Sequence, residues 1–167
     1  WQTAARQVWQ AVGAAEDGDV VLVTNGTYNL SAPISISKGI TLRSVSGPLV
    51  TAFNGQHSTR CVDLNHANAC VEGFCITNGY NSQWTIGGGG VHCERGLLVN
   101  CILIGNAAWF NGGGVSSGQQ CEMRDCAIVN NLAMGNVYMG GGGGLFSTGA
   151  VTVRNCLLSG NSASGRG

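Results

Sequence analysis

The chain has 167 residues and a formal net charge of zero; only 10% of its residues are charged, while 44% are hydrophobic. This balance gives no reason to expect a nucleic acid or an anionic membrane as partner, and no apolar run approaches the ~18 residues of a membrane-spanning helix. The hydrophobic content suffices for one continuous core, so we expect a single domain over residues 1–167, and the lack of an initiator methionine and of a signal peptide predicts a mature or excised segment.

The N-terminal stretch TAARQVWQAVGAA (3–15) is the one part of the sequence with a helical pattern. Its apolar face consists of Val8, Trp9, Val12 and Ala15. The Asp-Gly-Asp sequence that follows ends the pattern. Because stacked strands leave an open apolar end that a short amphipathic helix can cover, we predict a helical cap over residues 1–17.

Residues 18–86 contain short strand-like runs separated by turn signals. The runs are VVLV (20–23), ISI (34–36), ITLRSV (40–45), CVDL (61–64) and VEGFCITNG (71–79). The turn signals are Asn25-Gly26, Ser46-Gly47-Pro48 and Asn54-Gly55. We expect these residues to form irregular first coils.

Residues 87–167 repeat one pattern three times. Each unit begins with a glycine triplet and closes with an asparagine: GGGVHCERGLLVNCILIGN (88–106), GGGVSSGQQCEMRDCAIVNN (112–131) and GGGLFSTGAVTVRNCLLSGN (142–161). The aligned apolar positions are Val91, Val115 and Leu145; Leu98, Met123 and Val153; Leu103, Ile128 and Leu158; and Ala108, Ala133 and Ala163. One unit earlier, Phe74 aligns with the cysteine that recurs in the three units (Cys101, Cys126 and Cys156), and Ile76 aligns with Leu103.

This repeat favours a parallel β-solenoid over paired helices. Runs such as LLVNCILI and VTVRNCLL alternate with a period of two and are too short and too β-branched for helices. In a solenoid each strand pairs with its equivalent one coil away, so aligned residues stack about 4.8 Å apart. The sequence therefore predicts an all-β fold of stacked coils.

Stacking converts the aligned cysteines and asparagines into two ladders. The cysteine ladder, which we expect to point inward as small apolar side chains, consists of Cys101, Cys126 and Cys156. The asparagine ladder consists of Asn106, Asn131 and Asn161. It is predicted at a turn, where its side chains can bond the backbone and tolerate a left-handed conformation. The glycine triplets suit a corner with positive φ or closely packed coils.

Several segments resemble a known superfamily. The first residues, WQTAARQVWQAVGAAEDGDVVLVTNGTY, resemble the N-terminal segment of secreted right-handed parallel β-helix proteins of the pectate-lyase-like superfamily. RCVDL (60–64), VEGFCITNG and the repeated GGGV…NC…GNA resemble its bacterial surface members and the repeats of polymorphic outer-membrane autotransporter passengers. The resemblance covers nearly the whole chain and implies a right-handed parallel β-helix with a short N-terminal capping helix. Because this scaffold carries lyases, hydrolases, adhesins and structural fibres alike, it does not specify a function.

No metal or cofactor site is predicted. The sequence has no Cys-x-x-Cys pair, and its histidines are scattered at positions 57, 66 and 92. The ladder cysteines are interpreted as core thiols rather than bridges. A disulfide is open to Cys61, Cys70 and Cys75, which lie close in sequence. Cys93, which aligns with Ser117 and Ser147, is the candidate for a reactive thiol.

The acidic residues do not form a recognisable catalytic pair. Enzymes on this scaffold use clustered carboxylates, often with calcium, together with an arginine or lysine base, and a glycosidase needs two facing acids. Glu122 and Arg124 point out of one strand with Arg154 stacked above Arg124, which indicates a solvated face. Because no acid–base constellation converges, we predict that the chain is not an enzyme.

Aromatic side chains gather in the turns between the asparagine ladder and the next glycine triplet. They are Tyr80, Trp84, Trp109, Phe110 and Tyr138. Stacked coils would bring these turns to one edge as an apolar stripe that binds a sugar or a protein. Alternatively, each loop folds back to cover its own corner.

The C-terminal sequence GNSASGRG lacks the polar capping repeat that a soluble solenoid needs. An uncovered coil offers unpaired strand edges and an apolar cross-section, which favours head-to-tail addition. We therefore predict an extracellular or cell-surface structural solenoid that self-associates, head to tail or laterally, into a rod or filament, or continues into further coils of a larger surface protein. A fragment whose next coils were removed explains the same end equally well. A polysaccharide-binding adhesin is the alternative function, and a polysaccharide lyase or hydrolase a third.

Overall fold

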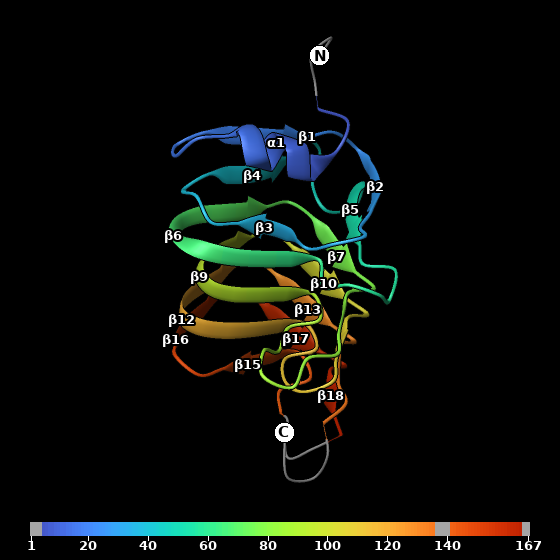
Figure 1. The fold of residues 1–167 in the computed structure, drawn as a ribbon. Coiled ribbons are helices and arrows are strands. Elements are labelled where there is room, and N and C mark those ends of the chain that lie inside the picture. The colour runs from blue at the N-terminus through green and yellow to red at the C-terminus, as the bar shows by residue number, and fades with distance from the viewer. Residues whose placement is uncertain (1–4, 136–140, 165–167) are drawn as a thin grey trace.

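The computed structural model describes residues 5–135 and 141–164, and over these residues the chain forms a parallel β-solenoid (Figure 1). Strands stack coil upon coil, and a single short helix lies at the N-terminal end. The predicted all-β solenoid with an N-terminal helix is confirmed. Within the described residues, no helix has the length and apolar character needed to cross a membrane.

The helix α1 (Val8–Ala14) covers the first coil (Figure 1). Val8 and Val12 are buried, whereas Trp9 is 63% exposed, so its predicted place on the apolar face is wrong. Residues four apart share one helix face, and only that narrow face meets the solenoid. At the C-terminal end of the helix, Lys38 Nζ donates to the carbonyls of Gly13 (2.8 Å) and Ala15 (2.6 Å). These bonds satisfy carbonyl groups that have no hydrogen-bond partner within the helix.

The strands form three sheets that run along the solenoid. The first sheet has the order β1 (Val20–Val23), β4 (Thr41–Ser44), β6 (Val62–Glu72), β9 (Val91–Val99), β12 (Val115–Arg124) and β15 (Leu145–Ser147), with β3 (Ile34–Ile36) beside β6 and β16 (Ala150–Arg154) beside β12. The second sheet contains β2 (Gly26–Asn29), β5 (Thr51–Asn54), β7 (Cys75–Thr77), β10 (Ile102–Ile104), β13 (Ala127–Val129) and β17 (Leu157–Ser159). The third contains β8 (Tyr80–Asn81), β11 (Ala107–Ala108), β14 (Leu132–Ala133) and β18 (Ser162–Ala163).

The register of these parallel strands matches the sequence alignment. Val115 pairs with Val91 and Leu145, and Met123 with Leu98 and Val153. In the second sheet the paired column is Ile76, Leu103, Ile128 and Leu158. In the third it is Ala108, Ala133 and Ala163. The predicted pairing of equivalent residues on successive coils is confirmed.

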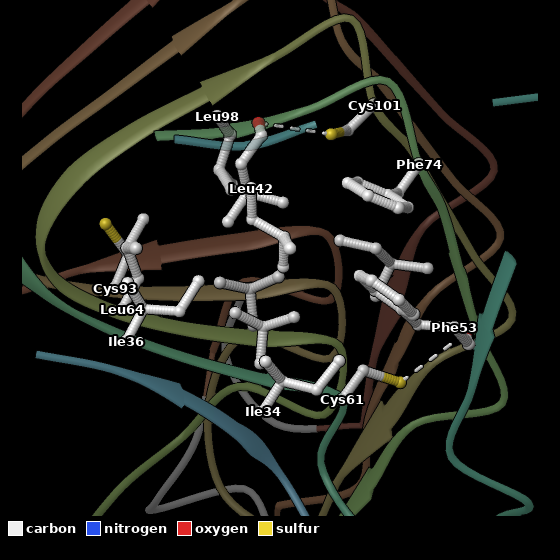
Figure 2. Packing of buried hydrophobic residues seen from close by; sticks show 14 of the residues in the cluster. Ile34, Ile36, Leu42, Phe53, Cys61, Leu64, Phe74, Cys93, Leu98 and Cys101 are labelled. Atoms are coloured by element: carbon white, nitrogen blue, oxygen red, sulfur yellow. Dashed lines mark hydrogen bonds between the residues drawn. The ribbon is translucent and has the colours of Figure 1, made fainter. Parts of the chain in front are cut away.

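Alternate residues of each strand point into the solenoid and fill it. Figure 2 shows Leu42, Leu64 and Leu98 directed into the space that the strands enclose, and all three are fully buried. Phe53 and Phe74 stack with ring centroids 4.3 Å apart. The core is therefore a continuous column of stacked side chains.

The asparagine ladder is a buried hydrogen-bonded chain along one corner. Asn131 Oδ1 accepts from both the backbone N–H and the Nδ2 group of Asn106 at 3.0 Å. Its own Nδ2 donates to the Leu103 carbonyl and to Asn161 Oδ1, each at 2.9 Å. The left-handed conformation expected at these turns belongs instead to neighbouring residues, such as Gly105 (φ 66°) and Asn130 (φ 53°). The ladder side chains thus bond the backbone while the preceding residue makes the turn.

The cysteines are all free thiols, so no bridge joins Cys61, Cys70 and Cys75. Cys101 and Cys126 are buried, and the N–H of Cys126 donates to the sulfur of Cys156 at 3.4 Å. Burial raises the pKa of the Cys61 thiol to about 12.

The prediction that Cys93 is reactive is wrong. Its side chain is completely buried, and a hydrogen bond with Cys121, together with burial, raises its pKa. A thiol that stays protonated and inaccessible is a poor nucleophile.

Candidate functional site

Three of the predicted aromatic residues, Trp84, Trp109 and Phe110, lie on loops that connect the third sheet to the first. Trp84 and Trp109 are 59% and 39% exposed, and their rings meet edge to face with centroids 5.7 Å apart. Tyr80, the first residue of β8, and Phe110 are half-buried. Tyr138 lies outside the described residues. The structure therefore brings the two tryptophans of successive coils together and leaves them accessible.

Hydrogen bonds between the two loops set this contact. The N–H of Trp109 donates to the Asn81 carbonyl at 2.7 Å, and the N–H of Gly88 donates to the Asn111 carbonyl at 2.9 Å. The Asn81 side chain also ties its own loop, since its Oδ1 accepts from the N–H of Gln83 at 3.1 Å. The loops stack with the same coil-to-coil register as the strands below them.

The glycine triplets let these loops lie directly on the coils. A Cβ atom at Gly90 would lie 2.7 Å from the Gly114 carbonyl oxygen, and one at Gly113 would lie 2.5 Å from the Leu132 carbonyl carbon. Real Cβ atoms do not approach backbone this closely, so only glycine fits. The close approach of coils, one of the two roles predicted for the triplets, is what these two glycines provide.

A buried arginine fastens the Trp84 loop to the first sheet. Arg60 Nε donates to the Gly88 carbonyl at 2.8 Å, and Nη2 to the Gly87 carbonyl at 2.9 Å. Its Nη1 group forms an ion pair with Asp63 Oδ1 at 2.5 Å. The arginine side chain is only 9% exposed, whereas that of Asp63 is 30% exposed. Arg60 thus links the loop to the first sheet from inside the protein, and Asp63 is the member of the pair that reaches solvent.

A polar cavity of about 290 Å³ lies beside Arg60 and Asp63. Its lining includes Ser58, Arg60, Asp63, Tyr80, Asn81 and Gln83. Gln83 directly precedes Trp84, so the cavity and the tryptophan pair are built partly from the same loop. Polar groups that converge on a concavity beside exposed aromatic rings are typical of a ligand site.

An outward-facing row of polar residues continues from Asp63 across the next coils. Asp63 pairs with His92, and His92 pairs with Ser116. Burial and, secondarily, Arg60 lower the pKa of His92, while Asp63 and Glu94 act in the opposite direction. Its Nδ1 atom is buried without a hydrogen-bond partner among the described residues. The row therefore places a neutral imidazole beside two carboxylates.

Sequence reasoning missed this row because it extended the alignment of the glycine-rich units to the preceding coil only at Phe74 and Ile76. The signal lies in the preceding coil, where Cys61-Val62-Asp63-Leu64 matches Gly90-Val91-His92-Cys93. Glu122, by contrast, lies on a solvated face, as the sequence suggested. Glu122 contacts Arg124 at 3.1 Å, and Arg124 pairs with Arg154 on the next coil.

Neither a protein-family model nor a curated protein sequence matches this chain. Among solved structures, it is similar to a pectin methylesterase that was crystallised in complex with a hexasaccharide. The two share 11% sequence identity with a TM-score of 0.52, over 94% of this chain and 63% of the other, so this chain spans less than two thirds of that protein's length. The likeness shows a shared parallel β-helix fold.

This comparison contradicts the prediction that the chain is not an enzyme, because a protein of the same architecture is one. The reasoning behind that prediction also fails on physical grounds. It found no acidic residues that converge across adjacent coils, yet Asp63 on one coil and Glu94 on the next both act on the pKa of His92. A missing motif in the repeats therefore does not exclude catalysis.

Proposed function

We propose that this chain is a polysaccharide-binding β-solenoid of an extracellular or cell-surface protein, of the kind found in bacterial surface proteins. The observation that carries the proposal is the exposed Trp84–Trp109 pair next to the polar cavity. Aromatic faces pack against the C–H surface of sugar rings, and neighbouring polar groups bind the hydroxyls. A solved structure of similar fold is described in complex with a hexasaccharide, which supports the same ligand class for this chain.

Substitution of the tryptophans tests the proposal. Trp84→Ala and Trp109→Ala should each weaken binding to a polysaccharide selected from a broad panel by about threefold to tenfold, the range expected for one aromatic contact. Trp9→Ala is the control, because Trp9 is about as exposed as Trp84 but lies on the helix α1. Circular dichroism should show unchanged strand content in all three variants. Failure of the wild-type chain to bind any neutral or acidic polysaccharide in the panel would overturn the proposal.

A second candidate function is self-association into a rod, or continuation into further coils of the same protein. Val153 and Leu158 are 38% and 46% exposed, although their column neighbours Met123 and Ile128 are completely buried. The core is thus uncovered at the last described coil, and another coil would cover it. Contacts between the C-terminal end of one copy and the N-terminal end of the next generate filaments.

Sedimentation analysis tests this second function. If copies of the chain stack on one another, Leu158→Lys should shift the sedimenting species towards monomer. The control is Leu49→Lys, since Leu49 is 87% exposed in the β4–β5 connection and has no place in the stack. A wild-type chain that remains monomeric at high concentration would exclude the rod.

A further inference from the structure

We infer that the cavity beside Arg60 selects an uncharged hexose unit and disfavours a uronate, with the Asp63 carboxylate as the acceptor for sugar hydroxyls. This inference rests on the proposed polysaccharide-binding function and specifies its ligand. It depends on the size of the cavity, on the way the Arg60–Asp63 pair is oriented, and on the loop that the cavity shares with the tryptophan pair.

The cavity has room for one sugar ring. Its volume of about 290 Å³ equals that of roughly ten water molecules at ~30 Å³ each, which is comparable with a hexose and its hydroxyl groups. Tyr80 and Gln83 line it together with Asp63. Trp84 follows Gln83 on the same loop, so we infer that a polymer bound at the tryptophans places an adjoining unit in the cavity.

The more exposed charged group of the cavity is a carboxylate. Only Arg60 and Asp63 are charged among the residues that line it. The guanidinium is nearly buried, and three of its N–H groups donate to two carbonyls and to Asp63 Oδ1. The other carboxylate oxygen, Oδ2, accepts no hydrogen bond from the described residues, and the side chain is 30% exposed. A ligand therefore meets a carboxylate and not a free cation.

This polarity determines the class of sugar. Hydroxyl groups donate short, strong hydrogen bonds to a carboxylate, and a pair of adjacent hydroxyls on a sugar ring can donate to one carboxylate together. A uronate carboxylate in the same place would face the like charge of Asp63, while the Arg60 guanidinium that pairs with Asp63 is nearly buried and also bonded to two carbonyls. The cavity accordingly favours neutral hexoses.

The inference is tested by calorimetric titration of the full chain with neutral hexasaccharides (a glucan, a mannan and a galactan) and with a galacturonate hexasaccharide. We expect the best neutral ligand to bind at least tenfold more tightly than the uronate. Asp63→Asn should weaken neutral binding by about tenfold and reduce its advantage over the uronate, because the charge-assisted hydrogen bonds are lost. The control is Glu72→Gln, which neutralises the partner of Arg43 at the other end of the same strand β6.

Two further measurements keep the outcomes separate. Asparagine retains an oxygen for Arg60, so the near-ultraviolet dichroism of the tryptophan pair should not change in Asp63→Asn. If it does change, a second variant, Tyr80→Phe, replaces it as the test. This variant removes the hydroxyl of a residue that lines the cavity and should lower the affinity for the neutral ligand. Equal or tighter binding of the uronate, or unchanged neutral binding in both variants, overturns the inference, while continued sensitivity to Trp84→Ala leaves the proposed function standing. Absence of binding to every polysaccharide overturns both.

Discussion

The central asparagine of the buried ladder should be one of the most important polar side chains for the stability of this fold. Asn131 is 1% exposed and takes part in four side-chain hydrogen bonds, to Asn106 twice, to Leu103 and to Asn161. At a net value of about 1 kcal/mol for each bond, Asn131→Ala should lower the free energy of unfolding by about 4 kcal/mol. The loss is large because the buried N–H of Asn106 loses its acceptor.

Equilibrium unfolding in urea, followed by far-ultraviolet circular dichroism, measures this change. Asn131→Leu fills the same space without forming the bonds, so it should remain destabilising if hydrogen bonding rather than packing is the cause. Asn65→Ala is the control, because Asn65 lies exposed in β6 and its truncation should change stability by no more than about 0.5 kcal/mol. The reasoning is refuted if Asn131→Ala unfolds within 1 kcal/mol of this control, or if Asn131→Leu restores wild-type stability.

Two more predictions follow from the glycine corners and from His92. Gly113→Ala should destabilise the fold by on the order of 3 kcal/mol, since its Cβ would clash with the Leu132 backbone, whereas Gly13→Ala in α1, where the space is open, should stabilise it by about 0.5–1 kcal/mol in the same urea assay. Burial lowers the pKa of folded His92, so the unfolded chain binds the proton first, and the stability that neutral His92 provides is lost as the pH falls below about 6.5. The melting temperature of the wild type should therefore fall more between pH 8 and pH 5 than that of His92→Gln, and equal decreases would show that this histidine is not responsible.

The repeated part of the fold could be predicted from sequence because each coil imposes the same packing requirement. Leu98, Met123 and Val153 occupy one inward column, and only an apolar residue fits there, so the spacing of apolar residues determines the strand register. Trp9 shows the limit of this approach. Its apolar side chain fits a helical pattern, yet the position of α1 on the solenoid, which the pattern does not specify, leaves it in solvent.

The candidate site was only half visible in the sequence, for a related reason. Trp84 and Trp109 recur at equivalent turns, so the alignment located both. The aspartate at position 63 does not recur in the repeated units, where His92 and Ser116 take its place, and the role of Arg60 depends on which carbonyls the Trp84 loop presents to it. A contact that occurs once, between a strand and a loop 27 to 28 residues away, leaves no periodic signal.

The departures from the repeat also confine the proposed cavity to one position along the solenoid. The outward row passes from Ser35 through Asp63 and continues as His92, Ser116 and Phe146, so acidic character occurs at one coil and the row ends in an apolar residue. Additional coils at the C-terminal end would lengthen the solenoid without reproducing the cavity. Binding on the lateral face and stacking through Leu158 therefore use separate surfaces. For this reason Leu158→Lys should leave polysaccharide binding intact, and Trp84→Ala should leave any self-association intact, so a chain that performs both functions would lose them one at a time.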